Sequence, residues 1–157
     1  MIKKAALALG GNLGDVTAAF KTAARKLEAA GMINIKLSHF RTTAPVDCAP
    51  GTPDFLNAAL TGDWAGSAEE LFAVCQSIER ESGRAAVHGI NTPRPLDIDI
   101  ILFDDRITNS ETLQIPHPRA AQRLFVIAPL AEIAPEMIFP DTGKKVSDLL
   151  KTLSDLS

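Results

Sequence analysis

Residues 96–103 read Leu-Asp-Ile-Asp-Ile-Ile-Leu-Phe, an apolar stretch that two aspartates interrupt. A short run of this kind predicts a buried β-strand. Alternate residues of a strand point to the same face and lie ~6.6–6.8 Å apart, so Asp97 and Asp99 are expected side by side. The same alternation assigns Ile101 and Phe103 to the face of the aspartates. It assigns the other residues of the run to the opposite face: Leu96, Ile98, Ile100 and Leu102.

Two carboxylates in so apolar a strand predict a bound cation. Each charge disfavours ionisation of the other, and burial disfavours both. Mg²⁺ is the natural candidate, because it prefers hard oxygen ligands and is commonly held by one or two carboxylates together with substrate phosphates. Zinc is disfavoured, because no His or Cys stands at ligand spacing nearby. The alternative is that Asp97 and Asp99 lie at the solvent-exposed end of the strand and bond backbone amides.

Arg94 stands three residues before the first aspartate, in the turn Thr92-Pro93-Arg94-Pro95. Pro95 restricts the backbone of Arg94 to an extended conformation, which presents the guanidinium rigidly. An arginine held beside a two-carboxylate cation site is typical of enzymes of phosphoryl transfer, in which positioning and charge neutralisation supply most of the catalysis.

The rest of the chain predicts alternating helices and strands around this strand. Asp15 precedes a helical pattern that ends at Gly31, and Ser67 with Glu70 has the spacing of a capping box. The order favours an α+β sandwich of the ferredoxin-like kind, an antiparallel sheet with helices packed on one side. The expected strands are residues 4–9, 33–40, 55–64 and 96–103, and the expected helical segments are 15–30, 67–83, a short turn within 116–123, 125–133 and 146–156.

Composition restricts the class of protein. The 157 residues fit one domain, over residues 1–157, and 46% apolar with 22% charged residues is ordinary for a soluble protein. A net charge of −3 and a pI of about 5.6 argue against nucleic-acid binding. No stretch reaches the ~20 apolar residues of a membrane span. The two cysteines indicate no disulfide framework. We therefore expect a cytoplasmic protein that binds neither nucleic acid nor membrane.

Four segments, in order along nearly the whole chain, resemble the 6-hydroxymethyl-7,8-dihydropterin pyrophosphokinases, which are enzymes of folate biosynthesis. Any one segment alone would be weak, whereas four in register are specific. They are residues 8–15 (Ala-Leu-Gly-Gly-Asn-Leu-Gly-Asp), 43–46 (Thr-Ala-Pro-Val) with 53–59 (Pro-Asp-Phe-Leu-Asn-Ala-Ala), 93–99 (Pro-Arg-Pro-Leu-Asp-Ile-Asp), and 115–119 (Ile-Pro-His-Pro-Arg) with Arg123 and Phe125.

The resemblance implies a ferredoxin-like sandwich with a cleft across it. It also implies two Mg²⁺ ions between Asp97, Asp99 and the phosphates of ATP. The pterin hydroxyl would attack the β-phosphorus and AMP would leave, in a protein that we expect to be a monomer. No residue stands as an obvious general base, and a hydroxyl acidified by the metal could substitute for one.

The resemblance also implies roles for individual residues. Arg94 and Arg123 would bind the phosphates, His117 would donate to them, and Arg84 would be a further catalytic residue. Asn57 would offer a donor and an acceptor to the pterin edge. The pterin set is Thr43, Ala44, Val46, Phe55, Asn57 and Phe125, and the ATP set is Gln76, Glu79, Ile100, His117, Arg119 and Arg123. Several residues of the two sets have an ordinary structural alternative. Phe55 and Phe125 could be core residues, His117 could serve only the turn, and Arg119, Gln76 and Glu79 could be solvated surface residues.

The chain departs from the family in residues 84–94, which correspond to a lid over both substrates. A second basic residue is missing where Ala86 stands, and an aromatic residue is missing near Asn91. One lost charge-assisted hydrogen bond is typically worth ~1.5–3 kcal/mol, so ATP affinity or closure could fall by roughly ten- to a hundredfold. A pterin- or nucleotide-binding module of the same fold with impaired turnover is therefore the alternative to a working enzyme.

Overall fold

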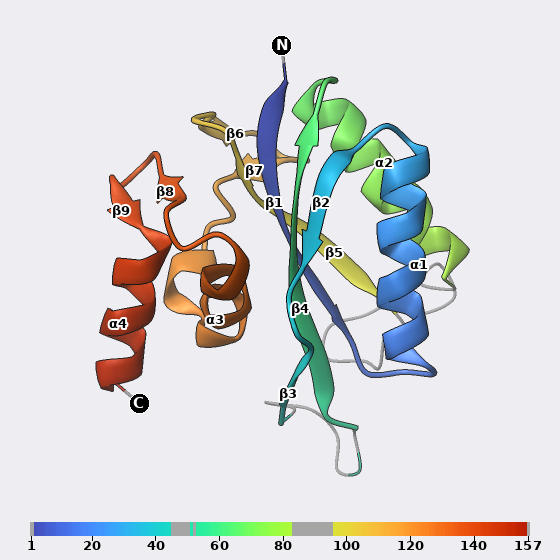
Figure 1. The fold of residues 1–157 in the computed structure, drawn as a ribbon, viewed down its shortest axis with the longest axis horizontal. Helices are drawn as coiled ribbons and strands as arrows, with labels where there is room; N and C mark the ends of the chain where they lie inside the picture. Colours follow the sequence, from blue (N-terminus) through green and yellow to red (C-terminus); the bar gives the residue numbers. More distant parts are fainter. Residues whose placement is uncertain (1, 45–50, 52, 83–95, 157) are drawn as a thin grey trace.

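The computed structural model describes residues 2–44, 51, 53–82 and 96–156. These residues form an α+β structure around one antiparallel sheet, in which β1 lies between β4 and β5, and β4 also pairs with β2 and β3 (Figure 1). The sheet therefore has the order β2-β4-β1-β5. Its strands are β1 (Lys3–Gly11), β2 (Ile33–Leu37), β3 (Arg41–Thr43), β4 (Phe55–Trp64) and β5 (Asp97–Phe103).

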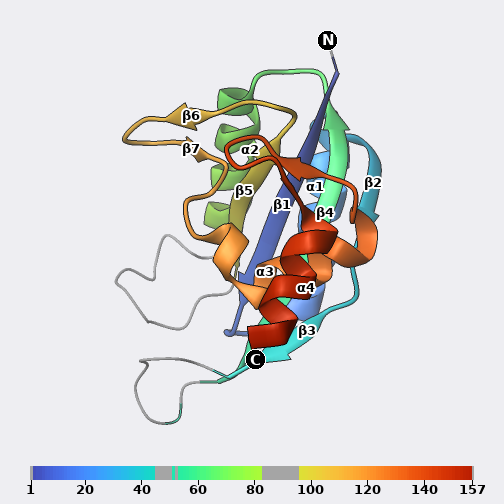
Figure 2. The ribbon, with the colours of Figure 1, turned by 90° about the vertical axis from the view of Figure 1, so that its left-hand side faces the viewer.

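Helices cover both faces of the sheet, so the prediction that they pack on one side is wrong. α1 (Val16–Ala29) and α2 (Ala68–Glu81) lie on one face, and α3 (Leu124–Ile133) and α4 (Val146–Leu156) lie on the other (Figure 1). Figure 2, turned toward the second face, shows α3 and α4 together in front of the sheet. The apolar run of β1 explains this arrangement, because a strand covered on both faces needs apolar side chains on both. Two hydrophobic cores result, an α1/α2 core between the sheet and α1 with α2, and an α3/α4 core between the sheet and α3 with α4. Leu7 and Leu9 belong to the first, whereas Ala6 belongs to the second.

The helix ends follow the chemistry predicted for them. The Asp15 side chain accepts from the backbone of Ala18 at 3.0 Å, and Ser67 and Glu70 form a reciprocal capping box. After α1, Gly31 has a φ of 120°, and the N–H of Met32 reaches the carbonyl of Leu27 at 3.0 Å. This closing bond needs a residue that tolerates positive φ, which glycine does.

A β-bulge in β5 overturns part of the predicted facing of residues 96–103. Ala6 pairs with Leu102 but Leu7 pairs with Ile100, so Ile101 is an extra residue on β5. Beyond the bulge the faces exchange: Leu102 packs in the α3/α4 core and Phe103 in the α1/α2 core. The predictions for Leu102 and Phe103 are therefore wrong, while Asp97, Asp99 and Ile101 keep the expected common face.

The predicted strand 33–40 ends early, at Leu37, because Ser38 interrupts it, and β3 (Arg41–Thr43) is a separate strand that was not predicted. The N–H of Ser38 bonds the carbonyl of Ala59, and the hydroxyl of Ser38, not its carbonyl, accepts the N–H of Ala59, both at 2.9 Å. Two short hairpins and a 3₁₀ turn complete the described structure, in which no helix is long and apolar enough to cross a membrane. They are β6 (Thr108–Asn109) with β7 (Gln114–Ile115), β8 (Ile138–Phe139) with β9 (Lys144–Lys145), and the turn η2 (Ala120–Gln122).

Candidate active site

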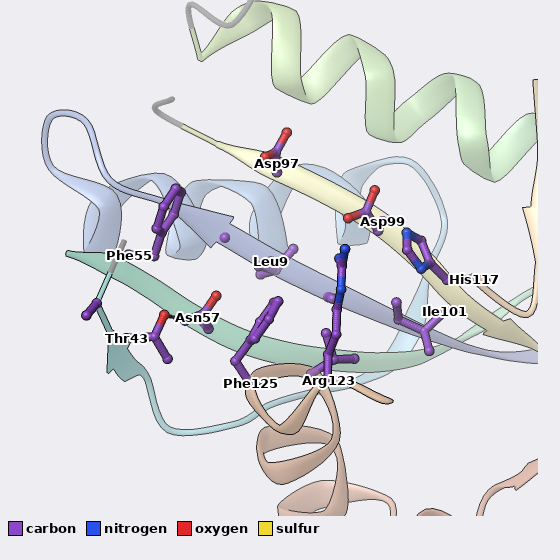
Figure 3. Close-up of a pocket in the computed structure, with 14 residues that line it drawn as sticks. Leu9, Thr43, Phe55, Asn57, Asp97, Asp99, Ile101, His117, Arg123 and Phe125 are labelled. Carbon is purple, nitrogen blue, oxygen red and sulfur yellow. Dashed lines mark hydrogen bonds between the residues drawn. The ribbon is translucent and has the colours of Figure 1, made fainter. Parts of the chain in front are cut away.

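A cavity of about 540 Å³ lies on the α3 face of the sheet, among β1, β3, β4, β5 and the start of α3 (Figure 3). It brings together residues that are far apart in the sequence and that were predicted to serve the pterin, the metal or the phosphates. The predicted residues that line it are Thr43, Ala44, Phe55, Asn57, Asp97, Asp99, His117, Arg123 and Phe125.

A second cavity, of about 230 Å³, adjoins β5 and the β6–β7 hairpin. Ile100, predicted for the ATP site, lines this smaller cavity and not the larger one. Asp99 and His117 line both cavities, so they form the junction between them. The described residues that line the smaller cavity are Phe72, Ile98, Asp99, Ile100, Glu111, Thr112, Leu113, Gln114, His117 and Pro118.

The two carboxylates of β5 project into the same open space (Figure 3). Asp97 is half-buried and Asp99 is exposed, and antiparallel pairing with Gly10 and Ala8 fixes their backbone. Among the described residues no group of three or more His, Cys, Asp or Glu side chains could hold a metal ion. Two oxygen ligands on an accessible strand fit Mg²⁺, which takes its remaining ligands from water and substrate, and not a zinc site closed by protein ligands.

His117 is held by its backbone and by its ring. Its N–H donates to the carbonyl of Ile101 at 3.2 Å, and its Nδ1 accepts the N–H of Arg119 at 3.3 Å. When the ring is neutral, its proton is therefore on Nε2. Burial lowers the pKa of His117, and the positive charges of Arg123 and Arg119 add to this effect against the opposing charge of Asp99. The geometry favours a neutral imidazole that donates from Nε2.

Arg123 lies directly before α3, and its guanidinium carbon is 5.5 Å from the centre of the Phe125 ring. This is the range of a cation–π contact. Figure 3 shows the side chain of Arg123 reaching toward Asp99 and His117. Phe125 is 41% exposed and Phe55 is half-buried, so neither ring is an ordinary core residue. Both offer aromatic surface to the cavity.

Asn57 is 6% exposed and its amide is held in place. Its Nδ2 donates to the hydroxyl of Thr43 at 2.9 Å and to the carbonyl of Arg41 at 3.5 Å. Gly10 opposes Asn57 across the β1–β4 pair, where a Cβ would stand 3.6 Å from Oδ1 of the amide. The pairing of β3 with β4 thus orients a carboxamide at the edge of the cavity.

Some predicted residues lie elsewhere. Gln76 and Glu79 line neither cavity: Gln76 is exposed on α2, and a carboxylate oxygen of Glu79 accepts the N–H of Ile98 at 2.7 Å. Arg119 is exposed beside His117. The positions of Val46, Arg84 and Arg94 lie outside the described residues.

The prediction missed several lining residues. Phe72 and the segment 111–114 were not singled out, although they form much of the smaller cavity. The strands β6 and β7 have two residues each, which is too short to show any alternation of apolar and polar residues. Apolar Leu9 and Val126, in the larger cavity, carry no signal that separates them from core.

Comparison with known proteins gives consistent matches. The model of the 7,8-dihydro-6-hydroxymethylpterin-pyrophosphokinase family matches residues 6–135. A Synechocystis sp. protein named 2-amino-4-hydroxy-6-hydroxymethyldihydropteridine pyrophosphokinase is 35% identical over 149 residues, which is 94% of this chain and 74% of that protein. A mitochondrial folate synthesis bifunctional protein of Arabidopsis thaliana is 38% identical over 137 residues, 87% of this chain but 24% of that protein.

Solved structures show the same fold. The HPPK-DHPS of Plasmodium falciparum, crystallised with pteroate, matches with a TM-score of 0.73 over 97% of this chain and 44% of that chain. The sequence identity in that match is 13%, so the likeness concerns the fold alone. The chain therefore spans about three quarters of the Synechocystis relative, but less than half of the plant and Plasmodium proteins.

Proposed function

We propose how two substrates share the cleft, on the premise that this chain belongs to the 7,8-dihydro-6-hydroxymethylpterin-pyrophosphokinase family. Its reaction is the pyrophosphokinase step of folate synthesis, in which pyrophosphate passes from ATP to 6-hydroxymethyl-7,8-dihydropterin and AMP is released. The observation that carries the proposal is the junction of the two cavities at Asp99 and His117. The pterin occupies the larger cavity, the adenosine occupies the smaller one, and the phosphates cross the junction.

The pterin site is supported by the flat and polar surfaces of the larger cavity. Phe55 and Phe125 provide aromatic faces for a flat heterocycle. Asn57, held by Thr43, presents its amide to the ring edge, and the backbone beside Thr43 and Ala44 completes the site. Val46 keeps its predicted part in this site.

The adenosine site is supported by the free edge of β5. N–H and C=O of one strand residue lie on the same side, and the side alternates along the strand. Since the N–H of Ile98 points away from β1 to Glu79, Ile100 presents its N–H and C=O to the same outer edge, which lines the smaller cavity. A purine edge with a donor and an acceptor fits this pair of backbone groups. Gln76 and Arg119 remain proposed ATP residues, and Glu79, predicted for the same set, is proposed to support this edge through the N–H of Ile98 and not by contact with the nucleotide.

Two Mg²⁺ ions are proposed to be held by Asp97 and Asp99. When bound, they would neutralise phosphate charge and make the pterin hydroxyl more acidic. The chain's own contribution is to align the phosphates: Nε2–H of His117 donates at the junction, and the Arg123 guanidinium stabilises negative charge that develops there. Arg84 and Arg94 are proposed to bind the same phosphates.

Further proposals concern the whole chain. The order β2-β4-β1-β5, with α1 and α2 each connecting two strands of the sheet, supports the ferredoxin-like description. A monomer stays a prediction, made because the proposed chemistry needs only one cleft. A single domain over residues 1–157 and a cytoplasmic location stay predictions from length and composition.

Product analysis tests the proposed function. The purified protein is incubated with ATP, Mg²⁺ and 6-hydroxymethyl-7,8-dihydropterin, and the nucleotides are separated. We expect AMP that depends on the pterin and disappears in the Asp97→Ala protein. ADP in place of AMP would refute pyrophosphoryl transfer, and pterin binding without any nucleotide product would leave only a binding module.

A further inference from the structure

The side chain of Glu79 reaches the backbone between the two aspartates of β5. Glu79 is half-buried on α2, and its Oε2 accepts the N–H of Ile98 at 2.7 Å. Ile98 separates Asp97 from Asp99, and its own side chain is 4% exposed in the α1/α2 core. Glu79 therefore contacts the strand from its outer edge, whereas the aspartates project into the larger cavity.

This contact anchors an edge strand that is otherwise paired only on one side. β5 pairs with β1 through Gly10–Asp97 and Ala8–Asp99, and no strand of the described residues pairs with its other edge. A carboxylate that accepts a backbone N–H at 2.7 Å makes a charge-assisted hydrogen bond, which is stronger than a neutral one. The Asp-Ile-Asp backbone is thus held on both edges.

Glu79 also adds a third negative charge near the aspartates. The buried thiol of Cys75 senses two of these charges: burial raises its pKa to about 12, and the carboxylates of Glu79 and Asp99 both contribute to the rise. Glu79 could therefore act as an anchor, through its hydrogen bond, or as a charge that attracts cations. The substitution Glu79→Gln separates the two, because an amide oxygen still accepts a hydrogen bond but carries no charge.

We propose that Glu79 is a positioning residue that fixes the direction of the Asp97 and Asp99 carboxylates by anchoring the amide of Ile98. Its effect on cation binding rests on the proposed function, whereas the anchor itself does not. The anchor acts before any substrate is present, so it is measurable in the free protein.

Two measurements on the same variants test the proposal. Amide hydrogen exchange of Ile98 in the free protein measures the anchor. The Mg²⁺ concentration that gives half-maximal AMP formation measures its consequence. In Glu79→Ala we expect Ile98 to exchange roughly 10- to 100-fold faster, the range implied by one lost charge-assisted hydrogen bond, and the Mg²⁺ requirement to rise. In Glu79→Gln both should stay within a few-fold of the unmodified protein.

Glu81→Ala is the matched control, because it removes the same charge from the same helix. Glu81 is exposed at the end of α2, where it pairs with Lys26 at 2.8 Å and accepts the hydroxyl of Ser77 at 3.2 Å. This variant should leave Ile98 exchange and the Mg²⁺ requirement unchanged. If Glu79→Ala does not fold, Glu79→Met keeps the length of the side chain without the acceptor.

Two results would overturn the proposal. Unchanged exchange of Ile98 in Glu79→Ala would show that no anchor exists. A Glu79→Gln protein in which Ile98 stays protected, but in which the Mg²⁺ requirement rises as far as it does in Glu79→Ala, would show that the charge of Glu79, and not the anchor, is what matters. If the unmodified protein forms no AMP, the proposed function fails, but the exchange measurement still decides whether the anchor exists.

Discussion

The hydrogen bond between Asn57 and Thr43 makes a quantitative prediction about pterin affinity. Thr43 contributes the acceptor that holds the Asn57 amide at 2.9 Å, and Asn57 is almost fully buried. Replacing Thr43 by Val keeps the shape of the side chain but removes this acceptor. The amide can then turn away from the orientation that suits the pterin edge, so the affinity should fall although the side chain of Thr43 is not proposed to bond the ligand itself.

The size of the effect follows from the bonds involved. One neutral hydrogen bond is worth about 0.5–1.5 kcal/mol, so Thr43→Val should weaken pterin binding by about 2- to 12-fold. Asn57→Ala removes the proposed bond that the amide oxygen accepts from the ligand and should weaken binding by at least about 2- to 12-fold. In the double variant the amide is already absent, so Thr43→Val should cost nothing further. The coupling free energy should therefore be about 0.5–1.5 kcal/mol.

Calorimetric titration of the four proteins with 6-hydroxymethylpterin measures this cycle. Thr42→Val is the control, because Thr42 is the exposed neighbour of Thr43 on β3 and does not line the cavity. It should bind the pterin as the unmodified protein does. If the losses for Thr43→Val and Asn57→Ala simply add, the reasoning is refuted, since Thr43 would then act independently of Asn57.

Three further predictions concern the metal, the core and pH. Asp99→Asn should lower AMP formation by at least about 100-fold and abolish the rise in melting temperature that Mg²⁺ causes. If Mg²⁺ raises the melting temperature of the variant as much as that of the unmodified protein, Asp99 is not a metal ligand. Gly62→Ala should lower the free energy of unfolding by about 1–3 kcal/mol in urea titration, because a Cβ there would stand 2.5 Å from Cγ and Sδ of Met32, which is fully buried. The N–H of His39 holds the pKa of Glu132 below its usual range, so this carboxylate stabilises the fold above its unfolded pKa and ceases to do so as pH falls through the folded pKa. The difference in unfolding free energy between the unmodified protein and Glu132→Gln should therefore shrink from pH 6 to pH 3, and a constant difference would contradict it.

The sequence predicted the elements whose periodicity is long and whose ends carry specific chemistry. The strand Phe55–Trp64 has the bounds expected for it, and the helix after Ser67 begins with the expected capping box. Ser38 shows what periodicity cannot detect, because its hydroxyl replaces a backbone carbonyl in the ladder and ends β2 early. Helices on both sheet faces were also missed, although Ala6 and Ala59 pack on the second face.

Prediction of the candidate site succeeded where a local pattern or the family resemblance named a residue. The common face of Asp97 and Asp99 came from strand alternation alone, whereas Phe125 and Asn57 came from the resemblance. The placement of Glu79 could not be predicted, because it depends on how α2 packs beside the free edge of β5. The resemblance assigned Glu79 to the nucleotide, but its carboxylate contacts the protein's own backbone.

The bulge in β5 explains why the junction between the two cavities can form. A regular strand would continue the alternation beyond Asp99 and direct every second carbonyl, that of Ile101 included, toward β1. The extra residue Ile101 interrupts this ladder, and its carbonyl instead accepts the N–H of His117. The strand that presents Asp99 thus also fixes the backbone of His117, although the two are 18 positions apart in the sequence. Any change that removed the bulge would therefore displace His117 relative to Asp99, even though neither residue had been altered.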